Sequence, residues 1–321
     1  MISQTKDSES QTLHNKPMLS SKASKVLDPE SYFIENNPPA NLNQISEKTK
    51  NFIKINKEAG RKVVLVTSGG TTVPLENNTV RFIDNFSAGT RGSASAEMFI
   101  KKQHYSMPEL GFLDFLNVDD SGNIHVKESL KKSLVQDIKT FNDAISDNRL
   151  IMPSFISLSD YLFALREITF QLSTLGPKSM FYLAAAVSDF FIPSKEMVEH
   201  KIQSSDGELS LKMNQVPKFL KPLVNTWAPN SFIISFKLET DEKMLEPKAR
   251  LSLEKYGHQA VVANMLHTRK QVVWIIQKEH IESAEEIRLT DEQIKKGVEI
   301  EDFLIERLVA LHDKFISQNS S

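Results

Sequence analysis

The sequence contains no cysteine, which excludes a disulfide framework, a thiolate metal site and a cysteine nucleophile. It also lacks long apolar runs, because none approaches the roughly 20 residues that a membrane-spanning helix needs. The polar N-terminal segment has no apolar core of the kind found in signal peptides. Basic and acidic residues nearly balance, at 39 and 41, so no basic surface for nucleic acid is expected. We therefore predict a soluble cytoplasmic protein, with the nucleus as an alternative location, that contacts neither nucleic acid nor a membrane.

The composition favours a globular domain behind a tail. Of the 321 residues, 40% are hydrophobic, which is enough for a sizeable core. Residues 1–38 are rich in Ser, Asn, Gln and Lys and are typical of a disordered tail. Residues 39–321 are expected to form a single domain.

Strand-like and helix-like segments alternate along this domain. Short apolar runs typical of buried strands lie at Lys62–Thr67, Met180–Val187, Phe232–Lys237, Ala260–Ala263 and Val272–Ile276. Helical patterns occur at Leu42–Ala59, Ser93–Lys102, Val126–Ile145, Phe155–Thr174, Pro217–Trp227, Asp241–Tyr256 and Val298–Phe315. This alternation predicts an α/β fold with a mostly parallel sheet and helices on both faces. The segment Glu199–Met213, with its turn at Asp206 and Gly207, predicts a hairpin flap.

Two glycine-containing segments lie on either side of a polar excursion. The first, Ser68–Thr71, directly follows the first predicted strand, and the second, Asn85–Gly92, opens a helix. Backbone N–H groups exposed at such places bind anions. The dinucleotide fingerprint and the Walker A motif are both absent, and glycines that serve only tight turns are the simpler alternative. We interpret the two segments together as a cradle for the phosphates of a nucleotide.

Small residues follow a second predicted strand, in Ala184–Phe190. In open α/β sheets, ligands bind at the carboxyl ends of the strands, and small side chains there let a ligand approach the backbone. Asp189 in this segment is able to accept a ligand hydroxyl or support a metal, and it is equally suited to capping a turn.

Four more polar or aromatic positions are candidates. Phe236 and Asn264 each end a predicted strand, where an asparagine suits either a nucleotide base or an ordinary turn. Lys201 and Lys212 lie in the flap, where a cation would neutralise charge in a transition state, although most lysines are simply solvated. The eight histidines show no metal-ligand spacing.

Five segments, in this order, resemble those of a known family. They are VTSGGTTVPLENNTVRFIDNFSAGTRG, MFYLAAAVSDFFIP, EHKIQSS, FIISFKLETD and VVANML. Together they closely resemble the eukaryotic phosphopantothenoylcysteine synthetases, which are phosphopantothenate–cysteine ligases. The resemblance runs from about residue 40 to the C-terminus.

The resemblance implies a Rossmann-like sheet, a homodimer and a ligase of coenzyme A biosynthesis, with other enzymes of that pathway as further partners. It implies ATP as the nucleotide, with CTP as the alternative, together with Mg²⁺. The carboxylate of 4′-phosphopantothenate would react with the nucleotide to give an acyl-nucleotide and pyrophosphate. The amine of L-cysteine would then displace the nucleoside monophosphate.

The same resemblance assigns roles to individual residues. Asn85 would handle the acyl group, and Lys201 would stabilise charge during adenylate formation. Ala185 and Ala186 would join Asn85 in binding phosphopantothenate. The nucleotide-binding positions would be Gly69, Gly70, Ser87, Gly89, Gly92, Asp189, Phe236 and Asn264. No metal ligand is implied within the protein.

The sequence departs from the family after Lys102. Family members continue there into a glycine-rich turn and a second strand, whereas here residues 103–106 lead directly to Met107 and Pro108. We therefore predict that the second strand is missing, unless a segment such as Leu110–Leu116 takes its place. A missing strand would leave a sheet edge open.

Two alternatives to a ligase are weighed. A nucleotide-sugar or NAD(P)-dependent oxidoreductase would call for the absent G-x-G-x-x-G motif and an acidic residue after a second strand. A catalytically impaired scaffold subunit of a coenzyme A-synthesising assembly is favoured by the missing strand, while the presence of Asn85, Asp189 and Lys201 argues against it.

Overall fold

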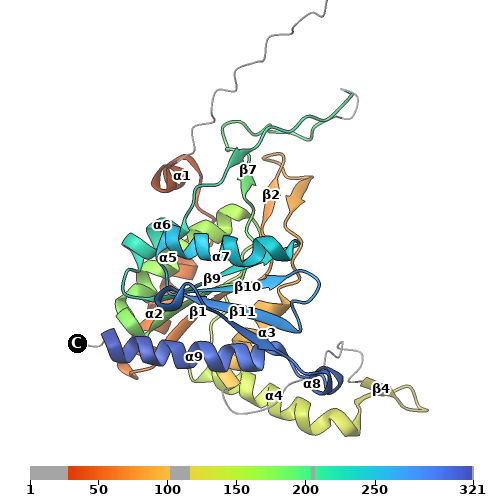
Figure 1. The fold of residues 1–321 in the computed structure, drawn as a ribbon. Helices are drawn as coiled ribbons and strands as arrows, with labels where there is room; N and C mark the ends of the chain where they lie inside the picture. The colour runs from red at the N-terminus through yellow and green to blue at the C-terminus, as the bar shows by residue number, and fades with distance from the viewer. Residues whose placement is uncertain (1–27, 102–115, 204–206, 320–321) are drawn as a thin grey trace, which may run out of the picture.

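The computed structural model describes residues 28–101, 116–203 and 207–319. A six-stranded sheet forms its centre, in the order β1-β6-β9-β10-β11-β12 (Figure 1). The strands are β1 (Val63–Thr67), β6 (Ser179–Leu183), β9 (Phe232–Glu239), β10 (Ala260–Met265), β11 (Val272–Gln277) and β12 (Ala284–Arg288). From β1 to β10 the neighbours are parallel, and β11 and β12 add two antiparallel pairings. The predicted α/β class with a mostly parallel sheet is confirmed.

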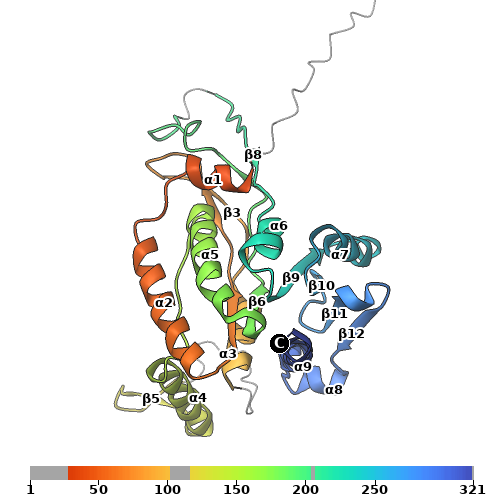
Figure 2. The ribbon, with the colours of Figure 1, turned by 90° about the vertical axis from the view of Figure 1, so that its left-hand side faces the viewer.

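Helices cover both faces of the sheet (Figure 2). One core contains Phe181 and Ile233 and packs against α2 (Leu42–Glu58) and α5 (Leu158–Leu172). Successive strand residues point to opposite faces, so the neighbouring Tyr182 lies in the second core. That core packs against the remaining long helices on its side, α3 (Thr90–Lys101) and α9 (Ile300–Asn319). A third cluster, under α7 (Glu242–Tyr256), covers β10 and β11.

Local sequence signals account for where two of the long helices start. Ser157 and Asp160 form a reciprocal capping box, in which each side chain accepts the backbone N–H of the other residue. Helix α5 therefore begins at Leu158, inside the predicted range Phe155–Thr174. Asp241 caps α7 by accepting the N–H of Lys243 at 3.0 Å. The remaining helices are α4 (Glu128–Ser146), α6 (Leu220–Pro222), which continues into a single π-helical turn at Leu223–Trp227, and α8 (Asp291–Lys295).

The predicted tail extends too far toward the C-terminus. Residues Pro29–Glu35 form helix α1, which starts where Asp28 accepts the N–H groups of Glu30 and Ser31. Tyr32 in this helix is only 2% exposed, and its ring packs edge-on against Phe191 and Phe219. Burial of these aromatic side chains stabilises the contact. The polar composition of residues 1–38 did not reveal this helix. Residues 1–27 lie outside the described residues.

Three small antiparallel pairs lie outside the main sheet. They are β2 (Thr72–Pro74) with β3 (Phe82–Asp84), β4 (Leu116–Val118) with β5 (Ile124–Val126), and β7 (Phe190–Phe191) with β8 (Asn214–Gln215). The last pair closes the base of the predicted flap. Within the flap, the described residues 200–203 and 207–213 form no strands, so the predicted ladder of a hairpin is wrong there, and Asp206 lies outside the described residues.

In the sheet formed by the described residues, strand β1 lies at one edge, with β6 as its parallel neighbour. Most of its residues are only partly buried. The loss of a second strand stays a prediction, because residues 102–115 lie outside the described residues. Leu116, at the end of the proposed replacement segment, belongs to β4 and pairs with Val126 instead.

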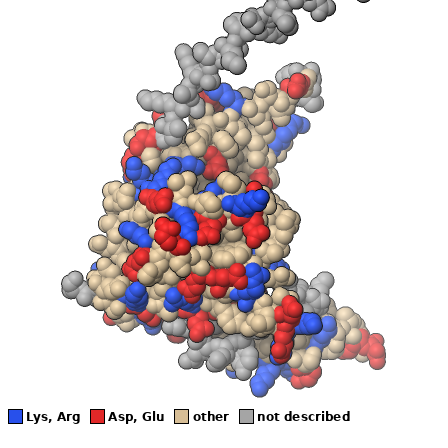
Figure 3. Space-filling view, in the orientation of Figure 1, with Lys and Arg blue, Asp and Glu red and all other residues tan. Residues whose placement is uncertain are grey.

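Within the described ranges, no helix combines the length and apolarity needed to cross a membrane. On the face seen in Figure 3, acidic and basic side chains are interspersed, as expected from their nearly equal numbers.

Burial of His258 makes stability depend on pH. The side chain is fully buried, its Nε2 lies 2.8 Å from Ser235 Oγ, and its Nδ1 has no hydrogen-bond partner among the described residues. Burial, assisted by the charge of Lys278, lowers the pKa of His258 to about 4. The unfolded chain therefore binds more protons than the folded chain between pH 6.5 and 4, and stability falls as the pH falls through this window.

We expect His258→Gln to remove part of this pH dependence. The free energy of unfolding of the unmodified protein should drop by about 2 kcal/mol more than that of the variant between pH 7 and pH 5. Urea unfolding at both pH values measures the difference, and His267→Gln, at an exposed position, is the matched control. Equal pH slopes for His258→Gln and the unmodified protein would contradict the assignment.

Candidate functional site

The loops that follow β1 and β6 are joined by backbone hydrogen bonds. Thr71 N–H donates to the Ala186 carbonyl at 3.1 Å, and Ala186 N–H donates to the Gly69 carbonyl at 2.8 Å. Side chains add to this pairing, because Thr67 Oγ1 accepts from Ala185 N–H at 3.2 Å. The parallel ladder is thereby extended beyond the ends of both strands, so the two loops form one surface at the carboxyl edge of the sheet.

The second glycine segment packs directly on the first. Asn85 N–H donates to the Thr71 carbonyl at 3.2 Å, and Ser68 Oγ donates to the Gly89 carbonyl at 2.8 Å. A Cβ on Gly70 would lie 1.9 Å from the Asn85 carbonyl oxygen, and a Cβ on Gly92 would lie 2.5 Å from Ser68 Cβ. These glycines therefore allow two backbone segments to approach each other, which is a packing role that the turn interpretation did not include.

Helix α3 begins directly at this contact. Gly89 has a φ of 73°, in the region that favours glycine, and its N–H donates to Ser87 Oγ at 3.3 Å. The first N–H groups of a helix have no partner within the helix. The start of α3, at Thr90, therefore provides donors and a partial positive charge suited to a phosphate.

Phe236 and Asn264 lie on neighbouring strands of the same sheet. The prediction that Phe236 ends its strand is wrong, because β9 continues to Glu239. The Phe236 ring packs edge-on against Tyr182 at 4.7 Å between centroids, and Tyr182 hydroxyl lies 2.7 Å from Ser95 Oγ on α3. Asn264 is the penultimate residue of β10 and is 4% exposed. Phe236 is thus connected to α3 through Tyr182.

Asp189 follows the small residues after β6 and faces solvent. Its carboxylate accepts from Lys218 Nζ at 3.0 Å, with a side chain that is 72% exposed. Across the ranges that the structure describes, no group of three or more acidic or histidine side chains is arranged to hold a metal ion. Asp189 therefore belongs to no such group among these residues.

Lys201 lies at the opposite end of the β2–β3 hairpin from Asn85. Thr72 pairs with Asp84 at one end of this hairpin, next to Asn85, whereas the turn of residues 75–81 closes the other. The flap contacts that turn just before Lys201, since Asn77 N–H donates to the Val198 carbonyl at 2.9 Å. The three residues of β3 span about 10 Å of extended chain. The structure therefore does not bring Lys201 to the glycine segments, and Lys212 pairs instead with Glu196 at 3.6 Å.

Comparison with known proteins identifies relatives along most of the chain. The family model for the DNA/pantothenate metabolism flavoprotein C-terminal domain matches residues 167–297. A phosphopantothenate–cysteine ligase of Homo sapiens is 43% identical over 281 residues, which cover 81% of this chain and 89% of the human protein. The chain belongs to the phosphopantothenate–cysteine ligase family. The resemblance found in the sequence is thereby confirmed.

A solved structure of this family has the same fold. It is a mutant of Cab2 in complex with phosphopantothenate-cysteine, with a TM-score of 0.80 and 37% identity, covering 91% of this chain and all of that one. Phosphopantothenate–cysteine ligase CAB2 of Saccharomyces cerevisiae is likewise 37% identical, over 335 residues that cover 92% of this chain and 89% of that protein.

The ligase chain also has a cavity that the sequence analysis missed. It has a volume of about 320 Å³ and lies beside the start of α3, lined among others by Arg91, Arg269 and Lys270. Arg91 pairs with Glu301 at 2.9 Å, and both side chains are largely buried. Burial raises the pKa of Glu301, although the charge of Arg91 opposes this. Thr90 and Arg91 lie between Gly89 and Gly92 in the sequence, and this position within the glycine segment was the available signal for the cavity.

The glycine packing of this ligase predicts a stability effect with a defined sign. Gly92 lies inside α3, where alanine is intrinsically favoured by about 1 kcal/mol. Its added Cβ would nevertheless lie 2.5 Å from Ser68 Cβ, so we expect Gly92→Ala to destabilise the protein by about 1–3 kcal/mol.

Urea unfolding measures this effect. Ser93→Ala, at the adjacent exposed position, is the control and should be neutral or slightly stabilising. Ser68→Gly should recover part of the loss in the double variant, since it removes two of the three closest atoms. A Gly92→Ala variant as stable as Ser93→Ala would disprove the contact.

Proposed function

We propose that this protein joins 4′-phosphopantothenate to L-cysteine through an acyl-nucleotide. The observation that carries the proposal is the convergence of Asn85, Ala185 and Ala186 with the glycines at one edge of the sheet. The family relatives named as phosphopantothenate–cysteine ligases support this substrate pair, as does the product bound in the similar Cab2 structure.

The first step is attack of the pantothenate carboxylate on the α-phosphorus of the nucleotide, with pyrophosphate as the leaving group. Both reactants are anions, so donors are needed where negative charge gathers. The N–H groups of Gly69, Gly70 and the start of α3 would supply them to the phosphates, with Ser87 beside them. Phe236, Asn264 and Asp189 would hold the base and ribose.

Asn85 would contact the acyl group between the two glycine segments. The Asn85 N–H donates to the Thr71 carbonyl, and the Thr71 N–H donates to the Ala186 carbonyl, so the backbone from which the Asn85 amide extends is linked to the alanine segment. An uncharged amide donates to a carboxylate oxygen and later to the acyl carbonyl without adding negative charge. The cysteine amine then attacks the acyl carbon, loses a proton, and releases the nucleoside monophosphate.

We further propose ATP as the nucleotide, with CTP as the alternative, and Mg²⁺ as its counter-ion. Mg²⁺ commonly keeps several waters and binds through substrate phosphates with few carboxylates. That mode fits the absence of a three-ligand cluster among the described residues. Mg²⁺ bound to the nucleotide phosphates would neutralise charge on the pyrophosphate leaving group.

A homodimer is part of the proposal. The β2–β3 hairpin and its flank expose apolar side chains, with Phe82 at 57% and Phe86 at 95%. Exposed aromatic groups next to a site are typical of interaction surfaces. Lys201 would stabilise charge during adenylation. It would reach the phosphates either when the flap and the hairpin tip that bonds Ile202 move together, or from a second copy of the chain. Contacts with other coenzyme A enzymes remain an expectation.

Product analysis tests the proposed reaction. With ATP, Mg²⁺, 4′-phosphopantothenate and cysteine, we expect AMP and pyrophosphate release that depends on phosphopantothenate. Asn85→Asp places a negative charge beside the acyl group, and we expect it to bind nucleotide but to lose at least about 100-fold in ligation. Unchanged turnover in Asn85→Asp would remove Asn85 from the mechanism, and no reaction by the unmodified protein would favour the scaffold alternative.

Lys201→Gln isolates the adenylation step. If Lys201 stabilises the charge that develops on the phosphates, its loss should slow pyrophosphate release about 10–100-fold while nucleotide binding stays within about twofold. Lys212→Gln, a flap lysine paired with Glu196, is the control. Unchanged pyrophosphate release in Lys201→Gln would show that the flap lysine has no role in this step.

A further inference from the structure

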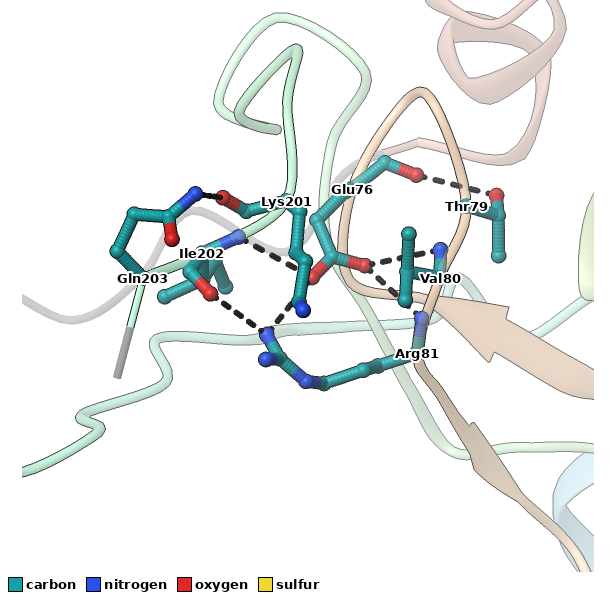
Figure 4. A network of polar contacts seen from close by, with 7 residues as sticks. All are labelled: Glu76, Thr79, Val80, Arg81, Lys201, Ile202 and Gln203. Atoms are coloured by element: carbon teal, nitrogen blue, oxygen red, sulfur yellow. Dashed lines mark hydrogen bonds and ion pairs between the residues drawn. The ribbon is translucent and has the colours of Figure 1, made fainter. Parts of the chain in front are cut away.

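A buried carboxylate connects the tip of the β2–β3 hairpin with Ile202 in the flap. Glu76 has a fully buried side chain in the turn between the two strands (Figure 4). A carboxylate in such a position is costly unless it is paired and hydrogen-bonded. Its contacts therefore indicate what it stabilises.

Four donors occupy the two oxygens of Glu76. Oε2 accepts from the N–H of Val80 at 3.3 Å and of Arg81 at 3.0 Å. Oε1 accepts from Arg81 Nη1 at 3.1 Å and from Ile202 N–H at 3.4 Å. Burial raises the pKa of Glu76, but the backbone donors and the Arg81 guanidinium lower it more, so the net pKa lies below its usual range. The group is an anion at neutral pH.

The same network holds the residue after Lys201 on both sides. Ile202 donates its N–H to Glu76, and its carbonyl accepts from Arg81 Nη1 at 3.0 Å. The Lys201 side chain is exposed. In Figure 4 it extends from the backbone segment that this network fixes.

We propose that Glu76 is a positioning residue for the flap lysine: by bonding the hairpin tip and Ile202 at once, it fixes where Lys201 stands. The inference rests on the proposed function only in giving Lys201 a role in adenylation. Glutamine in place of Glu76 has nearly the same shape but one acceptor oxygen, and its NH₂ group would face N–H donors. Glu76→Gln should therefore release Ile202 from the hairpin.

The first measurement is cleavage by trypsin at the Lys201–Ile202 bond. A protease needs this segment to open locally, and we expect the bond to be cleaved at least about tenfold faster in Glu76→Gln than in the unmodified protein. Cleavage after Lys212 should change by less than about twofold, because it is outside the network. Glu199→Gln is the matched control: Glu199 is exposed and accepts from the side chains of Asn77 and Asn78 at the same junction. An unchanged rate at Lys201–Ile202 in Glu76→Gln would overturn the proposal.

The second measurement is a double-mutant cycle on pyrophosphate release. If Glu76 acts through Lys201, Glu76→Gln should lower kcat about tenfold alone, leave the KM for nucleotide within about twofold, and add little in a Lys201→Gln background. Full additivity of the two losses would overturn the positioning role.

A Lys201→Gln variant with normal activity would instead refute the adenylation role of Lys201 and leave the cleavage result to decide the contact. Should Glu76→Gln fail to fold, Glu76→Asp, which keeps the charge but has less reach, should show the same faster cleavage and the same coupling.

Discussion

Two backbone hydrogen bonds between the loops after β1 and β6 support the whole candidate site. They exist because β1 and β6 are parallel neighbours, so that their carboxyl ends meet at one edge. Gly69, Thr71 and Ala186 continue this pairing past the strands. Asn85 is then fixed by the Thr71 carbonyl, and α3 is fixed by the contact of Ser68 with Gly89. Asn85 and the start of α3 therefore depend on the pairing of those two loops, whereas Phe236 and Asn264 are held by the pairing of β9 with β10.

Two buried carboxylates near this region are stabilised in different ways. Glu76 is surrounded by backbone N–H groups and an arginine, which together outweigh its burial and keep its pKa low. Glu301 has Arg91 as its ion-pair partner, and its burial prevails, so its pKa is raised. Backbone N–H donors do not lose their protons near neutral pH, so they favour the anionic form of Glu76. The Arg91–Glu301 pair, in contrast, borders a cavity and has a charge that is more easily altered.

Much of the architecture could be predicted from the sequence, because periodic apolar segments and caps act locally. The helices at Leu42–Glu58 and Leu158–Leu172 and the central strands follow directly from such patterns. Helix α1 was missed although Asp28 and Pro29 are a local start signal, because its burial depends on Tyr32 packing against aromatic residues far along the chain. The site was only partly accessible for the same reason. The glycines, Asn85 and the alanines are adjacent to strand ends, whereas the location of Lys201 depends on how the flap folds back onto residues 76–81, a long-range contact without a local signal.

The position of β1 at the sheet edge affects how the site responds to thermal fluctuation. Its residues are only partly buried, while β10 in the interior is almost fully covered. An edge strand exchanges its amide hydrogens through openings of lower free energy than a central strand does. The first glycine segment is the direct continuation of β1, so an opening of this strand also disorders the loop that is proposed to bind phosphate. A ligand held by that loop would stabilise the closed state by mass action, so binding at the site would also increase the protection of the β1 amides.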